Sequence, residues 1–297
     1  MKISCCYLYM IDHFGYPPKL ENVFTSLRKQ RELGFDYVEL EGVYEDNLKE
    51  VYDARERLKT ECDSLGLKIT NFSPILPDLV SLDKQKRDHA LDLYRLGVEL
   101  AVYFQASTVQ MDSYAPPLKY VGNRPYTGVI EYGTVYQVQV DPNFRWSDLW
   151  SVVVDSTARC NEMAKQADLK LVMEPRVGEI ISNTDALLRL MDAVGDPNVG
   201  AILDTAHLNA QKEILPLSIE KMGSRIYYLH VADNDGRENQ HLVPGDGAID
   251  WHGVFTCLKK HHFDGYVAVD VGNVPDTDDA YRRSIRFLKD LEKELGV

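Results

Sequence analysis

Several features that would mark a specialised class of protein are missing from this sequence. The five cysteines form no Cys-x-x-Cys pair and are odd in number, which argues against a disulfide framework and favours a reducing compartment such as the cytoplasm. No run of about 18 apolar residues occurs, so no membrane-spanning helix is expected. The glycine-rich motifs of nucleotide-binding loops are also missing, so the sequence implies no nucleotide cofactor.

Positive charge is scarce as well. The chain of 297 residues has 33 Lys+Arg against 46 Asp+Glu, a net charge of −13 at pH 7. This balance argues against nucleic acids and anionic membranes as partners, because both require a positive surface potential. With 44% hydrophobic and 27% charged residues, the composition is that of an ordinary globular protein. We therefore expect a soluble, cytoplasmic protein that acts on a small molecule.

Short apolar runs alternate with amphipathic stretches of helical period along the chain. The runs are apolar in their middles, which is typical of parallel strands covered on both faces. Eight strands are predicted, at Ile3–Leu8, Phe35–Leu40, Lys68–Phe72, Ser107–Met111, Leu169–Met173, Val199–Leu203, Ile226–Val231 and Tyr266–Val271. Repeated strand-then-helix units favour a single-domain (β/α)8 TIM barrel over residues 1–297, with a doubly wound sheet as the alternative.

Helices are predicted between these strands. Gly34 and Gly66 are expected to end the first two. The predicted helices span Leu20–Leu33, Asn47–Leu65, Lys84–Tyr103, Trp146–Gln166, Thr184–Val194, Leu217–Met222, Trp251–His262 and Asp278–Leu295.

One insertion interrupts the alternation of predicted strands and helices. Between the fourth strand and its helix lie 34 residues, 112–145, where about two to six are usual. Five of the 17 tyrosines fall within it, and the composition of Val129–Val140 around Tyr132-Gly133 predicts a β-hairpin. Loops that follow barrel strands leave from the face that carries active sites. We therefore expect the insertion to be a lid over such a site or an interface element.

Ionisable residues stand at the ends of four consecutive apolar strands. A carboxylate at one such position is most often a helix cap or turn residue. Four in succession are different, because closure of a barrel points the ends of its strands at one centre. Three carboxylates and one imidazole there suit Mn²⁺, Mg²⁺, Co²⁺ or Zn²⁺ and leave room for substrate oxygens. The residues are Glu174, Asp204, His230 and Asp270.

With these residues in place, the chain resembles the sugar phosphate isomerase/epimerase group of xylose isomerase-like TIM barrels. That group includes ketose 3-epimerases, hydroxypyruvate isomerase, inosose dehydratase and, more distantly, endonuclease IV. The resemblance covers nearly all of the chain except the insertion. It is carried by GFDYVELEG (34–42), LVMEP (171–175), NVGAILDTAHLNA (198–210), YYLHVADNDG (227–236) and PGDGAIDW (244–251).

The resemblance implies roles for individual residues. Glu174, Asp204, His230 and Asp270 resemble the family's ligands for one divalent ion, for which Mn²⁺ is favoured. In the epimerases, the carboxylates at the positions of Glu174 and Asp270 also move the proton, and the histidine at the position of His207 faces the substrate. The implied chemistry is removal of a proton beside a carbonyl, with the ion stabilising the enediolate oxygens.

The chain departs from the epimerase pattern at three positions. Asp270 stands where the family typically has glutamate, which favours a ligand over a proton-transferring base. An arginine six residues after the seventh-strand histidine is replaced by Gly236, with Arg237 adjacent. A substrate-contacting glutamate of the epimerases falls on Ile180, beside Glu179. A plain ketose 3-epimerase is therefore one reading among several.

Other polar residues are candidates for substrate contacts. Arg176 could bind a substrate carboxylate or hydroxyl or form a surface ion pair, and His241 and His13 could each reach the site. Glu39 and Glu41 end the second strand, where one could point into the barrel mouth or both could hydrogen-bond to nearby loops.

Three functions are compatible with this site. The first is a metal-dependent isomerase or epimerase of a keto-sugar or polyol, with Glu174 as the base. The second is a lyase on the same barrel, either a dehydratase or a C-glycoside deglycosidase that acts on a 3-keto-glycoside. The first reading predicts a homo-oligomer, whereas the deglycosidase reading also allows a small partner subunit. The third is a carbohydrate-binding protein without catalysis, which the intact ligand pattern disfavours.

Overall fold

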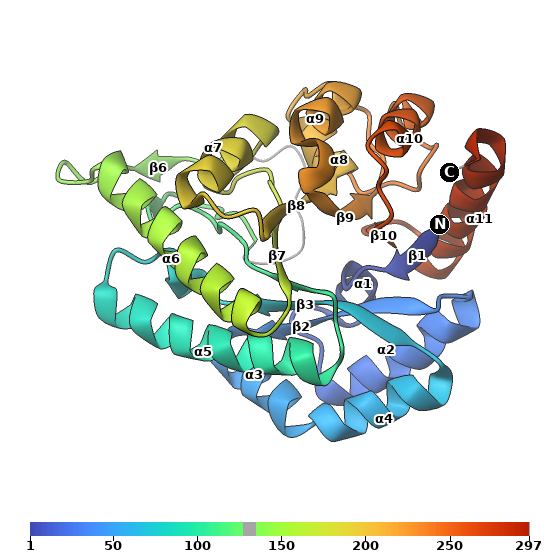
Figure 1. Cartoon of the computed structure of the whole chain (residues 1–297), viewed down its shortest axis with the longest axis horizontal. Coiled ribbons are helices and arrows are strands. Elements are labelled where there is room, and N and C mark those ends of the chain that lie inside the picture. Colours follow the sequence, from blue (N-terminus) through green and yellow to red (C-terminus); the bar gives the residue numbers. More distant parts are fainter. Residues whose placement is uncertain (127–134, 297) are drawn as a thin grey trace.

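Eight parallel strands close into a barrel at the centre of the molecule (Figure 1). The computed structural model describes residues 1–126 and 135–296. Around the barrel the strands follow the order β1-β10-β9-β8-β7-β4-β3-β2. Their bounds are β1 Lys2–Cys5, β2 Tyr37–Val43, β3 Lys68–Ile75, β4 Thr108–Gln110, β7 Lys170–Met173, β8 Val199–Asp204, β9 Ile226–Val231 and β10 Tyr266–Val269. The predicted (β/α)8 barrel is confirmed, with all eight strands at the predicted places.

Helices surround the barrel, with α2 to α5 on one side and α8 to α10 on the other (Figure 1). The α-helices are α1 Leu8–Phe14, α2 Leu20–Leu33, α3 Tyr44–Asp53, α4 Arg55–Leu65, α5 Lys84–Tyr103, α6 Trp146–Gln166, α7 Thr184–Val194, α8 Thr205–Ala210, α9 Leu215–Met222, α10 Trp251–Lys260 and α11 Thr277–Leu295. Two 3₁₀ turns, η1 Pro77–Val80 and η2 Gly223–Arg225, complete the elements. Among the described residues, no helix is long and apolar enough to cross a membrane.

The predicted helices differ from the observed ones mainly where local geometry overrides periodicity. The single helix predicted over Asn47–Leu65 is two helices, because Ala54 has φ −89° and ψ 1° and interrupts the α-helical backbone. Helices α1 and α8 were not predicted, since seven and six residues are too few to display a helical period. Gly34 and Gly66 end α2 and α4 in the left-handed conformation, as expected.

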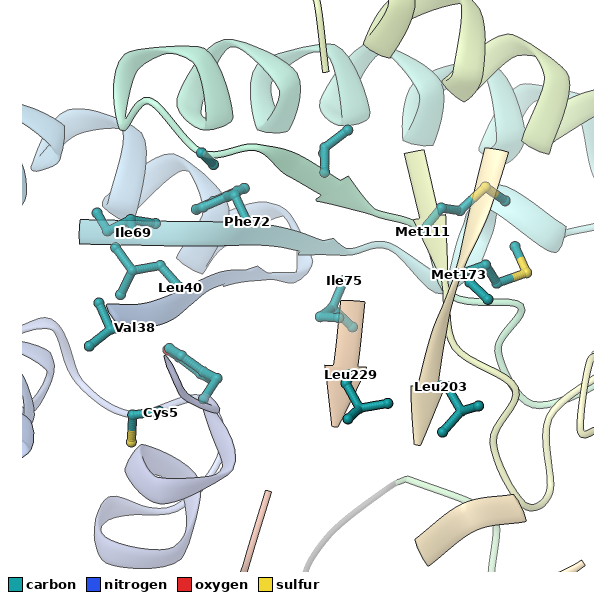
Figure 2. Close-up of a cluster of buried hydrophobic side chains, with 14 of the residues drawn as sticks. Cys5, Val38, Leu40, Ile69, Phe72, Ile75, Met111, Met173, Leu203 and Leu229 are labelled. Atoms are coloured by element: carbon teal, nitrogen blue, oxygen red, sulfur yellow. The ribbon is translucent and has the colours of Figure 1, made fainter. Parts of the chain in front are cut away.

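Two apolar layers hold the barrel together. The larger lies between the strands and the helices and includes Val38, Leu40 and Phe72 (Figure 2). The smaller fills the inside of the barrel with Cys6, Val172, Ile202, Tyr228 and Ala268. Polar side chains lie beyond this inner plug, toward the carboxyl ends of the strands. The candidate site therefore lies directly above this inner apolar cluster, at the carboxyl ends of the strands.

The insertion 112–145 carries a small sheet of its own. Strand β5, Lys119–Tyr120, pairs antiparallel with β6, Val138–Gln139. The hairpin predicted over Val129–Val140 has its turn, Tyr132-Gly133, outside the described residues, and its last part pairs with β5.

Candidate functional site

The four predicted strand-end residues converge at the mouth of the barrel. Glu174 follows β7, Asp204 ends β8, His230 lies in β9 and Asp270 follows β10. These strands are neighbours in the barrel, so their carboxyl ends share one rim. One ligand atom from each residue lies within 4.8 Å of the others, and all four residues are buried. We call these four residues the metal group, since their donor atoms are those of a divalent-ion site.

The charges of the metal group fit a cation. The buried atom Oδ2 of Asp204 has no hydrogen-bond partner among the described residues, although burying an unpaired carboxylate is costly. Burial and the neighbouring Glu174 raise the pKa of Asp204 well above its usual range. Burial would also raise the pKa of Glu174, but the charge and hydrogen bond of His230 outweigh it and hold the pKa at about 2. A divalent ion would relieve this crowding of carboxylates.

His230 connects the metal group to a second carboxylate. Its Nδ1 lies 3.0 Å from Oε1 of Glu174, and its Nε2 lies 3.1 Å from Oε1 of Glu39. Histidine ligands commonly donate their other ring N–H to a carboxylate, which fixes the ring and makes the ligand nitrogen more basic. Glu39 is placed to do this. Of the two glutamates at the end of the second strand, Glu39 therefore points into the barrel, which the sequence left open.

Replacing Glu39 with glutamine is expected to weaken divalent-ion binding about 10- to 100-fold, because the acceptor of the His230 ring N–H loses its charge. Titration of Mn²⁺ against a competing chelator measures this affinity. The matched control is Glu162→Gln, at an exposed position on α6. Equal affinities in the two variants would show that Glu39 does not act on His230.

His241 lies beside the metal group. Its Nδ1 is 3.1 Å from Oδ2 and 2.7 Å from the backbone oxygen of Asp270. Burial lowers the pKa of His241, but the charge of Asp270 outweighs burial and raises it to about 9. The structure therefore brings His241 to the site, where it holds the carboxylate of Asp270 in place.

His207 is buried next to these groups. The backbone N–H of Val177 donates to its Nδ1 over 3.2 Å, so the proton of the neutral ring lies on Nε2. Burial lowers the pKa of His207 to about 3, which keeps the ring neutral. The rings of His207 and His241 meet edge to face, 5.2 Å apart. His207 is thus available as a neutral hydrogen-bond donor through Nε2.

Arg176, which is half-buried, forms an ionic cluster with two buried carboxylates. Its Nη2 lies 2.6 Å from Oδ2 of Asp112 and 2.6 Å from Oε1 of Glu179. The other oxygen of Glu179 accepts from the Ser113 hydroxyl and the Tyr114 N–H. Burial and Asp112 oppose Arg176 in setting the pKa of Glu179, which rises to about 7. Arg176 is half-buried and Glu179 is buried, and the two side chains pair with each other.

The insertion contacts the Arg176 cluster and is linked to His207 through the backbone of Val177. The ring of Tyr126 lies under the guanidinium of Arg176, 4.7 Å from its centre. The Tyr126 hydroxyl donates to the Val177 oxygen over 2.6 Å, and the Val177 N–H in turn holds His207. A Cβ on Gly178 would lie 3.0 Å from Pro125, so the loop after β7 packs tightly on the insertion.

Asp112 and Tyr126 were not among the predicted site residues. A signal for Asp112 was present, since it follows the fourth strand as Glu174 follows the fifth. Nothing in the sequence distinguishes Tyr126 from the other tyrosines of the insertion. Two further predicted substrate contacts stay predictions: Nε2 of His13 is 3.1 Å from Oδ1 of Asp278, and Arg237 is exposed.

Comparisons with known proteins match this barrel. The chain matches the family described as "Xylose isomerase-like TIM barrel" over residues 27–291. It is 20% identical to the fructoselysine 3-epimerase of Shigella flexneri over 257 residues, which cover 83% of this chain and 84% of that protein. It is 23% identical to the inosose dehydratase of Clostridium beijerinckii over 164 residues, which cover 50% of this chain and 55%, about half, of that protein.

Among solved structures, similar folds are found in two epimerases. The 3-keto-D-glucoside 4-epimerase from E. coli has a TM-score of 0.76 and 19% identity, covering 98% of this chain and 99% of that one. L-Ribulose 3-epimerase has a TM-score of 0.75 and 17% identity, covering 99% and 95%. At these identities the likeness shows the fold.

Proposed function

The chain belongs to the xylose isomerase-like TIM barrel family, and from this premise we propose that it is a divalent-metal-dependent isomerase or epimerase of a keto-sugar or polyol derivative. The reaction is removal of a proton from a carbon next to a carbonyl. The observation that carries the proposal is the metal group itself, four buried donors of which Asp204 Oδ2 has no partner among the described residues. The fructoselysine 3-epimerase relative supports the same class of reaction.

The metal group supplies the charge that this chemistry requires. A proton beside a carbonyl is weakly acidic, so the reaction needs a base and a counter-charge for the oxygen. A divalent ion bound there supplies positive charge against the negative charge that grows on the carbonyl oxygen. Mn²⁺ is the ion we favour, with Mg²⁺, Co²⁺ and Zn²⁺ as alternatives for a set of three carboxylates and one imidazole.

Glu174 is the proposed base. Its pKa of about 2 keeps the carboxylate ionised at neutral pH, so it can accept a proton. Asp270 is held by His241 at one oxygen and is shorter than glutamate by one methylene, which suits a ligand better than a proton carrier. His207 is proposed to donate its Nε2–H to a substrate oxygen.

A lyase on the same barrel is the second candidate. His241 holds Asp270 in place, so Glu174 is the one residue of the metal group that we propose as a proton carrier. A single proton carrier favours the lyase. One base suffices to remove a proton before a neighbouring substituent leaves, whereas epimerisation needs a second group on the opposite face. The inosose dehydratase relative supports this reading, and the insertion beside Arg176 could contact an aglycone.

Solvent exchange distinguishes these functions. The Mn²⁺-loaded protein is incubated in D2O with a series of ketoses, 3-keto-glycosides and inososes, and the products are followed by NMR. An isomerase or epimerase introduces deuterium beside the carbonyl and keeps every substituent, whereas a lyase releases water or an aglycone. The proposal of proton transfer is wrong if no compound exchanges deuterium or loses a substituent, and a binding protein without catalysis would then remain.

A further inference from the structure

We propose that the rim formed by β2, β3 and β4 carries a second subsite, where Glu41, Ser73 and Tyr16 bind an uncharged hydroxyl group of the substrate and exclude phosphate esters. This subsite lies across the barrel mouth from the metal group. The inference rests on the proposed function for the identity of the ligand as a polyol. It goes beyond that function by assigning the end of the substrate that does not react.

The strand register places these side chains inside the barrel. Successive side chains of a strand alternate between its two faces. Glu39 reaches His230 in the interior, so Glu41, two residues later on β2, faces the same way and lies closer to the mouth. Ser73 of β3 is the register partner of Glu41, so its side chain shares that face. Two residues of strand rise by about 7 Å, which sets the height of Glu41 above Glu39.

The position suits the far end of a sugar. In the order of strands around the barrel, β2 and β3 lie opposite β8 and β9, which carry Asp204 and His230. Carbons four bonds apart along an extended chain are separated by about 5 Å, given single C–C bonds of about 1.5 Å. A ketose with its carbonyl at the metal group can therefore direct its last hydroxyl toward the β2–β3 rim.

Ser73 supplies the observation that points to a ligand. It is 3% exposed, and its hydroxyl has no hydrogen-bond partner among the described residues. A buried hydroxyl without a partner costs free energy, so a ligand that forms a hydrogen bond with it removes that cost. Next to it, Glu41 is half-buried and accepts a hydrogen bond from the Tyr16 hydroxyl over 3.3 Å. One incoming hydroxyl group can pair with both Ser73 and Glu41, since neighbouring strands are about 4.8 Å apart.

The charges around this rim select against anions. Burial and the neighbouring Asp112 raise the pKa of Glu41 to about 8, which makes it largely uncharged and able to donate a proton to an oxygen. Arg176 is the cation that acts on Glu41, but Asp112 and Glu179 already occupy its guanidinium. A phosphate would meet the charge of Asp112 with no uncommitted cation among the described residues named here, whereas a hydroxyl group would complete the hydrogen bonding of Ser73.

The test is equilibrium binding to the Mn²⁺-loaded protein by calorimetry. The probes are D-fructose, 6-deoxy-D-fructose, which lacks the terminal hydroxyl, and D-fructose 6-phosphate. We expect D-fructose to bind about tenfold or more tightly than either of the others. Ser73→Ala is expected to weaken D-fructose binding about five- to tenfold, a typical loss for one hydrogen bond, and to leave 6-deoxy-D-fructose binding unchanged. Because it removes an unpaired buried hydroxyl, this variant should unfold at the same or a higher temperature.

The controls are matched to the two contacts. Glu99→Gln is the control for Glu41→Gln, because Glu99 also accepts from a tyrosine hydroxyl over 3.3 Å but lies on the exposed face of α5. Ser64→Ala, exposed on α4, is the control for Ser73→Ala. Because Glu41 is largely uncharged at pH 7, Glu41→Gln should keep the discrimination against the phosphate at that pH but should lack the stronger discrimination that the unaltered protein gains at pH 8.5, where Glu41 ionises. The controls should follow the unaltered protein at both pH values.

Binding and turnover separate this inference from the proposed function. If D-fructose binds with the expected pattern but no compound of the series exchanges deuterium or loses a substituent, the subsite stands and the proposed reaction fails. If exchange occurs while the 6-phosphate binds as well as D-fructose, the reaction stands and the subsite is overturned. Equal binding of D-fructose to Ser73→Ala and Ser64→Ala, or no binding to any of these proteins, also overturns the subsite.

Discussion

Glu174→Gln is expected to lower proton exchange about a thousandfold or more in the Mn²⁺-loaded protein, whichever substrate the series of ketoses and keto-glycosides identifies. Removing a general base alone costs about 10²- to 10⁴-fold. Glutamine also removes one of the three anionic donors of the metal group, so weaker ion binding adds to the loss. The measurement is the initial rate of deuterium incorporation at a Mn²⁺ concentration that saturates the variant.

Saturation with Mn²⁺ separates the two roles of Glu174. A rate that recovers fully when more Mn²⁺ is added would show that Glu174 is a ligand and not the base. Glu162→Gln is the control for the charge change, because Glu162 is exposed on α6. The thermal unfolding temperature of Glu174→Gln should be lower than that of the control, because Gln can keep the hydrogen bond to His230 Nδ1 but loses the buried charge that pairs with this ring.

The metal group was predictable because each of its members is an ionisable residue at the end of a buried apolar strand, where such residues are unusual. A carboxylate or imidazole at the end of a buried apolar strand needs a partner, and the barrel geometry directs four such ends to one place. Both facts are local in sequence: the apolar run and its last residue. The eight strands were predictable for the same reason, since buried parallel strands are apolar in their middles.

The residues around the metal group were harder to predict, because loop conformations and strand register set their positions. The sequence carries little signal for either. Arg176 was assigned to substrate or surface, but the loops after β4 and β7 bring Asp112 and Glu179 to it. The inward position of Glu41 follows from the alternation of side chains after Glu39, but Ser73 is its partner because of a register shift between Val38 and Glu39, an irregularity of pairing that no periodicity reveals. Tertiary contacts of this kind become visible in the structure.

Asp204→Asn is expected to change metal binding and stability in opposite directions. The variant should bind Mn²⁺ at least about a hundredfold more weakly, since even partners outside the ligand shell contribute 10- to 100-fold. Without metal it should be more stable than the unaltered protein by about 1–3 kcal/mol at neutral pH, because the raised pKa of Asp204 makes the folded protein take up a proton that Asn does not require. Its amide nitrogen replaces the partnerless Oδ2 and can donate to a neighbouring carboxylate. The retained Oδ1 still accepts from the His207 N–H over 2.7 Å, which preserves the cap of α8.

Thermal unfolding with and without Mn²⁺ measures both effects in one experiment. The unaltered protein should gain stability as Mn²⁺ is added, because an ion that binds the folded state stabilises it by mass action. Asp204→Asn should start from a higher unfolding temperature and gain little. The control Asp155→Asn, exposed on α6, should follow the unaltered protein. A metal-free variant that unfolds at a lower temperature, together with an unchanged response to Mn²⁺, would mean that Asp204 serves only as the cap of α8. The opposite effects on metal affinity and on the stability of the metal-free protein are informative, because a residue whose role is stability alone would not destabilise the protein when its ion is absent.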